Sequence, residues 1–172
     1  MYNYICHFLG AHAVREPLEY AAADNETTLN IHSLVQIDGY SCGAVAGTMV
    51  VRTFYPEVKF RDFYKAVNPY PDGVGTTQLI NTLRKFNIGC RKIRLTFREI
   101  RKVIDDGCPV IVNIMSVHEE DHWAVVYGYK EDPKQVFISP DPGVVRKRMS
   151  WAKFKHKTRQ VDGIGIVCWG YE

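Results

Sequence analysis

The sequence has few cysteines and no pair at the Cys-x-x-Cys spacing. The five that it contains, Cys6, Cys42, Cys90, Cys108 and Cys168, are an odd number. Disulfide frameworks and structural zinc sites are built from sets of cysteines at characteristic spacings, so this pattern predicts neither and is typical of a reducing compartment. We therefore expect a cytoplasmic protein.

Long apolar runs are also absent. The longest extends from Cys108 to Met115 and is interrupted by Pro109 and Asn113, whereas a membrane-spanning helix needs about 20 predominantly apolar residues. The N-terminal residues lack the basic start of a secretory signal. The sequence thus predicts neither a membrane span nor a signal peptide.

No charge of one sign dominates the chain. The net charge is +3 over 172 residues, and so small an excess does not indicate a nucleic-acid partner. Two stretches, 84–102 and 146–159, are basic, and we interpret both as solvated faces. An acidic substrate or a nucleic-acid surface is the alternative for them, although no motif that reads RNA or DNA accompanies the charge.

The length suits one domain, and the residue patterns place helices before strands. A buried helix is expected between Ser41 and Tyr55, and further helices are expected from Thr76 and from a capping box at Thr96–Glu99. Val-, Ile- and aromatic-rich segments then predict strands at Pro109–Met115, His122–Tyr129, Gln135–Ser139 and Gly163–Trp169. Residues 29–35 give a weaker strand signal, and residues 20–26 look like a helix fragment or a polar linker. This order predicts an α+β fold with an antiparallel sheet.

Cys42 is the candidate nucleophile. It lies where the turn 39–41 leads into the first predicted helix, and both a helix N-terminus and a neighbouring imidazolium lower the pKa of a thiol. Gly43 is expected to leave room for the backbone of a substrate. Gln36, six positions before Cys42, carries amide donors that would form a two-donor oxyanion hole with the Cys42 backbone N–H.

His122 is the candidate base, because it opens a predicted strand and because imidazole titrates near neutral pH. Asp141 follows the next predicted strand and lies between Pro140 and Pro142. If the two strands pair antiparallel, Asp141 reaches the far nitrogen of His122 and fixes its tautomer. The sequence therefore predicts a catalytic set of Cys42, His122, Asp141 and Gln36.

Three segments together resemble the papain-like cysteine peptidases that process bacteriocin leaders. These are Gln36–Ala44, Asp121–Tyr129 and Ser139–Pro142. Such enzymes cut after a double glycine, often as the N-terminal domain of an ABC exporter. Each motif is short, but their order along the chain and their positions on the predicted elements match the family.

The resemblance covers residues 29 to about 154. It implies a papain-like peptidase domain at 29–172, with N-terminal helices packed on a C-terminal antiparallel sheet, after an extension at 1–28 whose role the sequence does not assign. It also implies that Gln36 is the oxyanion glutamine, Cys42 the nucleophile, His122 the base and Asp141 its partner. A peptide or protein is the expected substrate, no cofactor is implied, and the oligomeric state is not indicated.

Other interpretations of the same residues remain open. The same thiolate chemistry with a different acceptor for the acyl group would make the protein a transpeptidase or an amidase. A catalytically silent site would make it a pseudo-peptidase that binds a peptide without cutting it. Each candidate also has a structural interpretation: a core cysteine for Cys42, a structural histidine for His122, a turn for Asp141 and a strand end for Gln36. We interpret the other four cysteines as core residues.

The segment His118–His122 also fits the His-Glu-x-x-His pattern of zinc proteases. That pattern binds zinc only on a helix, where the two histidines share one face. Strand-like sequence precedes and follows the segment, so we expect a connection between strands and no metal site.

Overall fold

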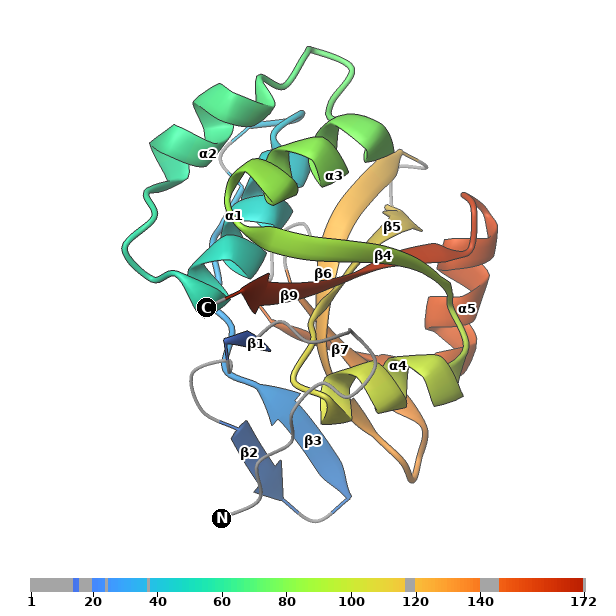
Figure 1. Cartoon of the computed structure of the whole chain (residues 1–172). Coiled ribbons are helices and arrows are strands. Elements are labelled where there is room, and N and C mark those ends of the chain that lie inside the picture. The colour runs from blue at the N-terminus through green and yellow to red at the C-terminus, as the bar shows by residue number, and fades with distance from the viewer. Residues whose placement is uncertain are drawn as a thin grey trace.

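The computed structural model describes residues 14–15, 20–23, 25–36, 38–116, 120–139 and 146–171. Within them lie five helices and nine strands (Figure 1). The helices are α1 (Cys42–Phe54), α2 (Phe60–Val67), α3 (Thr76–Lys85), α4 (Phe97–Asp105) and α5 (Trp151–Arg159). The strands are β1 (Val14–Arg15), β2 (Tyr20–Ala23), β3 (Glu26–Leu29), β4 (Ile88–Arg94), β5 (Val110–Met115), β6 (Asp121–Lys130), β7 (Gln135–Ser139), β8 (Lys147–Ser150) and β9 (Ile164–Tyr171).

All of these strands belong to one antiparallel sheet, which confirms the predicted α+β class. The sheet has the order β1-β9-β5-β6-β3-β2, with β4 added on β9, β7 on β6 and β8 on β7. The strand β6 pairs with β5 over its first half and with β3 at Gly128–Lys130, and β7 pairs along its other side. The start of β6, where His122 lies, is therefore paired with β5, whereas the pairing with β7 begins only at Val125.

The helix α1 is the most buried of the described helices. Every residue in it except Arg52 is buried, and it packs against β6 and β9. A Cβ atom at Gly47 would lie 2.4 Å from the ring of Phe63, so glycine lets α2 approach closely. The hydroxyls of Thr48 and Thr53 donate to the carbonyls four residues earlier, which satisfies these buried polar groups within the helix. Figure 1 shows α2 and α3 beside α1, with α4 and α5 at the other end of the sheet.

The predicted helices at α1, α3 and α4 and the predicted strands at β5, β6, β7 and β9 are confirmed. The predictions for residues 20–35 are wrong. Residues 20–23 and 26–29 form the hairpin β2–β3, not a helix fragment or linker, and residues 30–36 have no regular structure. Pairing with β6 stabilises β3 there, and such tertiary contacts override local propensity. The elements α2, β4, β8 and α5 were not predicted.

Ion pairs as well as backbone hydrogen bonds connect the hairpin to the rest of the sheet. The Glu26 carboxylate accepts hydrogen bonds from both terminal nitrogens of Arg148, at 2.9 and 3.0 Å, and from Lys130 at 3.2 Å. Glu26 is mostly buried, so water screens these pairs less than it would on an open surface. The predicted boundary between the extension at 1–28 and the peptidase domain at 29–172 falls within β3. The division of the chain into these two parts stays a prediction.

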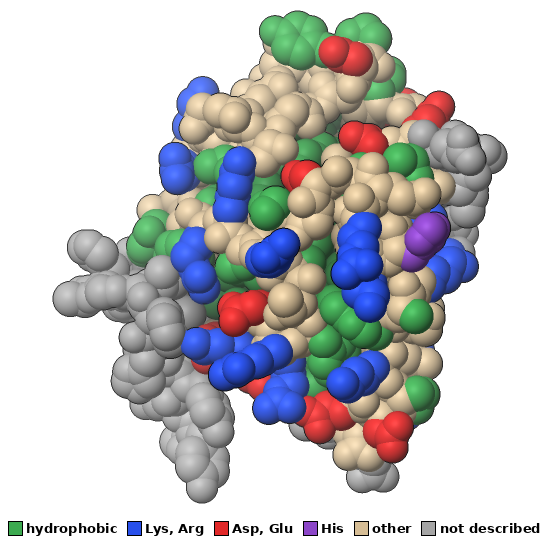
Figure 2. Space-filling view, turned by 90° about the vertical axis from the view of Figure 1, so that its right-hand side faces the viewer, with side chains coloured by type: hydrophobic (Ala, Val, Ile, Leu, Met, Phe, Trp, Pro, Cys, Tyr) green, Lys and Arg blue, Asp and Glu red, His purple; other side chains and the backbone are tan. Residues whose placement is uncertain are grey.

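The basic stretch 146–159 lies on β8 and α5. Figure 2 shows the side of the molecule that carries α4 and α5, where Lys and Arg side chains are spread widely with fewer acidic ones among them. Some cations of this region pack on aromatic rings: Arg148 lies 4.9 Å from the ring centroid of Phe137, and Lys134 lies 5.6 Å from that of Phe97. Some of these basic side chains thus also cover apolar surface. In the described part of the chain, no helix has the length and apolar character needed to cross a membrane.

Candidate active site

The loop before α1 is closed by one carboxylate. Asp38 Oδ1 accepts hydrogen bonds from the backbone N–H groups of Tyr40, at 3.1 Å, and Ser41, at 2.7 Å. Burial raises the pKa of Asp38, but hydrogen bonds from Ser41 and neighbouring groups outweigh it and hold the pKa below its usual value. The ionised carboxylate therefore fixes the turn that delivers Cys42 as the first residue of α1.

The Cys42 thiol lies among backbone donors at the start of the helix. The first helical hydrogen bond runs from Val45 N to Ser41 O, so the N–H groups before Val45 have no partner within the helix. Those of Cys42 and Gly43 act on the thiol, as does the N–H of Trp123 from β6. The sequence-based prediction of Cys42 at a helix N-terminus is confirmed.

The net effect on the acidity of this thiol is opposite to the expectation. Cys42 is only 7% exposed, and its burial raises the pKa of the thiol, to which the Asp38 carboxylate adds. The three backbone N–H groups lower the pKa but do not offset the burial. A thiolate at Cys42 thus depends on a proton acceptor beside it.

Gly43 has a different role from the one predicted. A Cβ atom there would lie 2.6 Å from Val74 Cβ and 3.1 Å from Trp123 Cδ1, so protein side chains and not a substrate occupy this space. The indole N–H of Trp123 donates to the carbonyl of Val74 at 2.7 Å. Glycine at this position therefore lets the segment before α3 and the start of β6 both pack against the nucleophile's helix.

A Gly43→Ala substitution tests this packing. We expect it to destabilise the fold by about 1–3 kcal/mol, because the added methyl forces Val74 and Trp123 apart. Urea denaturation followed by tryptophan fluorescence measures the change. Gly39→Ala in the same loop is the matched control, since a Cβ atom there has nothing within 4 Å. Equal stability of the two variants would show that the contacts at Gly43 relax without cost.

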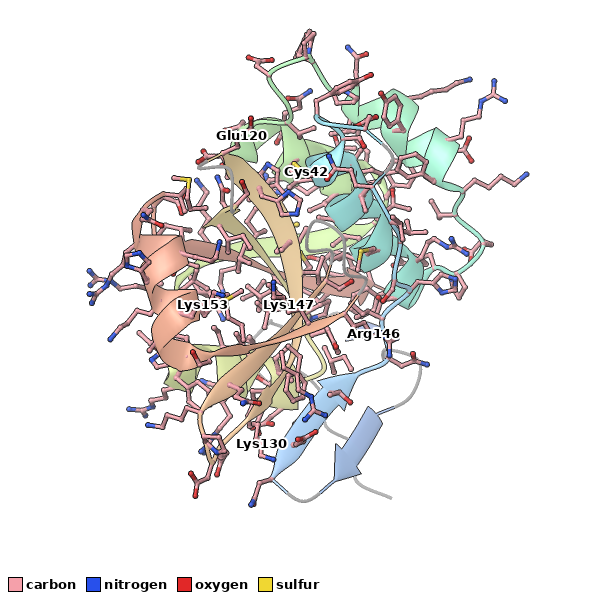
Figure 3. The ribbon with its side chains drawn as sticks, turned by 180° about the vertical axis from the view of Figure 1, so that it is seen from behind. Cys42, Glu120, Lys130, Arg146, Lys147 and Lys153 are labelled. Carbon is pink, nitrogen blue, oxygen red and sulfur yellow. The ribbon has the colours of Figure 1, made fainter. Side chains whose placement is uncertain are left out.

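His122 lies near the start of β6 and is 6% exposed. Its backbone N–H donates to Asn113 Oδ1 at 3.1 Å, and Asn113 Nδ2 donates to Asp121 Oδ2 at 3.3 Å. Because the N–H of the next residue, Trp123, acts on the Cys42 thiol, the structure brings the His122 segment to the helix N-terminus. Figure 3 shows Cys42 at the same end of the molecule as Glu120, which precedes β6.

The other two predicted residues come from neighbouring segments. Gln36 is half-buried in the loop before α1, and its Nε2 donates to the carbonyl of Asp38. Asp141 lies outside the described residues. The strand before it, β7, ends at Ser139, which pairs with Val125 of β6 in an antiparallel register. The strand β7 therefore runs towards the start of β6.

The segment with the zinc-protease pattern connects two strands, as predicted. The strand β5 ends at Met115, and the N–H of Ser116 donates to the carbonyl of Glu120 at 2.8 Å just before β6 begins. His118 lies outside the described residues, and His122 is on a strand and not on a helix. The described ranges hold no cluster of three or more His, Cys, Asp or Glu side chains able to bind a metal ion.

The family follows from comparison with known proteins. A model described as "Peptidase C39 family" matches residues 30–161, which is most of the chain. The chain belongs to the peptidase C39 family. It is accordingly a cysteine peptidase, and the family identity confirms the resemblance found in the sequence.

Solved structures share the papain-like fold of this C39 peptidase. The peptidase domain of Streptococcus ComA, a bifunctional ABC transporter involved in a quorum-sensing pathway, superposes with a TM-score of 0.68 and 22% identity, covering 80% of this chain and 97% of that domain. A double-glycine-motif protease from an AMS/PCAT transporter, solved with its leader peptide, gives 0.65 and 17%, covering 82% and 92%. A putative C39-like peptidase from Bacillus anthracis gives 0.68 and 15%, covering 84% and 98%. No curated protein matches the chain.

Three residues that organise the site of this C39 peptidase were not among the predicted ones. Asn113 positions the start of β6, Trp123 contacts both α1 and Val74, and Asp38 closes the loop before the nucleophile. A polar Asn113 within an otherwise apolar strand was a visible signal, because such a side chain needs a partner. The contacts of Trp123 and Asp38 are between segments or local to a turn, and the sequence pattern does not reveal them.

Proposed function

We propose that this C39 peptidase hydrolyses a peptide bond through the thiol of Cys42, with His122 as the base. The observation that carries the proposal is the placement of Cys42 at the N-terminus of α1, in contact with the backbone of the residue that follows His122. In this proposal Asp141 orients the imidazole, and Gln36 joins the Cys42 backbone N–H in the oxyanion hole. Membership of the C39 family supports cysteine-peptidase chemistry, and the roles of the four residues are part of this proposal.

The burial of Cys42 has a direct mechanistic consequence. Because burial raises the pKa of the thiol, an isolated thiolate is unfavourable there, and the proton must pass to a partner that stays beside it. His122 takes that proton, and the imidazolium stabilises the thiolate as an ion pair. The thiolate then attacks the substrate carbonyl, and His122 returns the proton to the leaving amine. Water, deprotonated by His122, releases the acyl group from the sulfur.

The oxyanion hole needs two donors aimed at the oxygen of the tetrahedral intermediate. The backbone N–H of Cys42 is one, since it has no partner within the helix. The amide nitrogen of Gln36 carries two hydrogens. The side chain donates to the Asp38 carbonyl and also acts on the Asp38 carboxylate, which anchors it beside the loop. In this proposal one of the two hydrogens turns to the oxyanion as the tetrahedral intermediate forms.

For the substrate we propose a peptide leader that ends in a double glycine. A structure of a similar double-glycine-motif protease contains its leader peptide. The low exposure of Cys42 also favours glycine, because the thiol of a cysteine that is only 7% exposed is reached more easily by a peptide without side chains than by one with a branched residue. The four described cysteines are all free thiols, which is consistent with the cytoplasmic location that we propose for the reaction.

Synthetic leader peptides test this substrate class. We expect cleavage after Gly-Gly into two products whose masses add up to that of the substrate plus one water. Cleavage should be at least about tenfold slower when either glycine is replaced by valine. Mass spectrometry identifies both the site and the acceptor. A product joined to an added amine would reassign the protein as a transpeptidase. Cleavage of valine peptides at the same rate would reject the double-glycine specificity, and binding with no cleavage of any peptide would support the pseudo-peptidase.

A further inference from the structure

Two cysteines outside the candidate active site lie opposite each other on neighbouring strands of the sheet. In the antiparallel pairing of β4 with β9, Cys90 lies directly opposite Cys168. Residues opposite each other in a ladder project their side chains from the same face, so the two sulfurs are neighbours. Neither residue has a part in the proposed peptidase reaction.

The hydrogen-bond pattern shows which kind of pair they form. Beyond the two ends of this ladder, Leu95 N donates to Gly163 O at 3.0 Å, and Tyr171 N donates to Asn87 O at 3.4 Å. Hydrogen-bonded and non-hydrogen-bonded pairs alternate along an antiparallel ladder. The pairs Leu95–Gly163 and Asn87–Tyr171 are therefore of the hydrogen-bonded kind. Alternation from either of them makes the pair of Cys90 and Cys168 non-hydrogen-bonded.

A separate contact agrees with this assignment. The N–H of Cys168 donates to the carbonyl of Pro109 at 3.0 Å, on the side of β9 away from β4. The Cα atoms of a non-hydrogen-bonded pair are about 4.5 Å apart, and their side chains are closer than in the other kind of pair. Disulfides span Cα separations of about 4.4–6.8 Å. The backbone therefore already has the spacing that a disulfide requires.

The two thiols differ in access and acidity. Cys90 is half-buried, whereas Cys168 is fully buried. A hydrogen bond from the Cys168 thiol lowers the pKa of Cys90, burial opposes this, and the nearby Arg84 guanidinium lowers it further. Burial raises the pKa of Cys168. Cys90 is thus the thiol that an oxidant reaches first, and Cys168 is a protected partner behind it.

We propose that Cys90 and Cys168 form an oxidative modification site, which closes to a disulfide when a hydroperoxide is present. The Cys90 thiolate attacks the peroxide O–O bond and takes one oxygen as a sulfenic acid, while the other oxygen leaves and becomes water. The Cys168 sulfur then attacks the Cys90 sulfur, gives up its proton and expels the second oxygen as water. Two thiols and one hydrogen peroxide thereby yield one disulfide and two waters, and a dithiol reductant reverses the change.

Peptide mapping of the full chain tests the proposal. The reduced protein is treated with one equivalent of hydrogen peroxide, its free thiols are alkylated, and it is digested with trypsin. We expect a cross-linked product that joins the peptide Phe86–Arg91 to the peptide that begins at Gln160, and dithiothreitol should return both peptides to the alkylatable form. The same cross-link is expected in a Cys42→Ala background, which removes competition from the candidate nucleophile.

Three variants complete the experiment. Cys90→Ala and Cys168→Ala should each abolish the cross-link, and in Cys168→Ala a dimedone adduct should accumulate on Cys90. Cys108→Ala is the matched control, because it alters another buried cysteine near Cys168 and should leave the cross-link intact. A Cys90 that ends as sulfinic acid in the wild-type chain, or a disulfide from Cys168 to Cys108, would overturn the proposal. Both outcomes are read in the wild-type protein and do not depend on the folding of a variant.

Discussion

Replacing Cys42 by alanine is expected to reduce cleavage of a double-glycine leader peptide by at least about 10⁴-fold, by analogy with other nucleophile-base pairs. The substitution removes the only atom in the proposal that bonds to the substrate. His122→Ala should have an effect of similar size, because the pair acts as a unit. Asp141→Asn should cost less, on the order of 10- to 100-fold, since a thiolate–imidazolium pair needs less orientation than a serine does. The measured quantity is kcat/KM.

The matched control for this series is Cys108→Ala. Cys108 is also buried, at 2% exposure, but it lies between α4 and β5, away from the N-terminus of α1. Its loss should leave kcat/KM near the wild-type value. Substantial turnover in Cys42→Ala would remove this residue from the mechanism. Full activity in Asp141→Asn would show that another group orients His122.

The pH dependence of alkylation tests whether His122 takes the proton of the Cys42 thiol or only lies near it. Burial raises the pKa of the Cys42 thiol, so without a base its thiolate forms only in alkaline solution and is lost as the pH falls through that raised pKa. In the wild type, an ion pair with His122 should keep Cys42 reactive towards iodoacetamide down to about pH 6. In His122→Ala the reactivity should shift to alkaline pH. Identical profiles for the two proteins would show that His122 does not hold the proton.

Gln36→Ala is expected to lower kcat by about 10²- to 10³-fold, because it removes one oxyanion donor. This donor acts mainly in the transition state, so kcat and kcat/KM should fall together while KM stays constant. The Gln36 amide also donates to the Asp38 carbonyl, so its removal could act by disturbing the loop before Cys42. Alkylation by iodoacetamide distinguishes the two causes, because that reaction forms no oxyanion.

A disturbed loop would change the alkylation rate of Gln36→Ala, whereas a lost oxyanion donor would leave it at the wild-type value. Gln78→Ala is the matched control. Gln78 likewise donates to backbone carbonyls of a preceding segment, those of Val67 and Asn68, but it lies on α3. Its variant should retain kcat. An unchanged kcat in Gln36→Ala would place the second oxyanion donor elsewhere.

The sequence predicted the parts of this fold that have a strong local signal. The small apolar residues of α1, the N-cap at Thr96 and the Val- and Ile-rich strands β5, β6 and β7 are all local patterns, and the structure confirms them. Thr96 Oγ1 accepts from the N–H of Glu99 at 3.1 Å, which is one of the two bonds of the predicted capping box, whereas the Thr96 N–H donates to the Arg94 carbonyl. The order of these elements was then sufficient to predict an α+β fold.

The parts that the sequence did not predict depend on distant contacts. Residues 20–23 are rich in alanine, a strong helix former, yet they form a strand because β3 beside them pairs with β6. At the site, glycine at 43 suggested open space, but two segments distant in sequence fill that space. The pKa of the Cys42 thiol is likewise raised by burial, although its place at a helix terminus predicted a lowered pKa. Burial is a property of the whole fold and is not visible in the local sequence.

The hairpin β2–β3 also covers the edge of β6 that β5 does not reach. Gly128 of β6 lacks the Cβ atom that would lie 2.6 Å from the carbonyl of Thr27, so β3 can pair closely there. A chain that began at Leu29 would leave the hydrogen-bonding groups of residues 128–130 of β6 open along that edge. It would also leave Lys130 and Arg148 without their shared carboxylate at Glu26. An exposed edge of this kind is a template for pairing with another copy. The hairpin covers it and moves the end of the sheet order to the four-residue strand β2, and a short edge strand offers less length for such pairing.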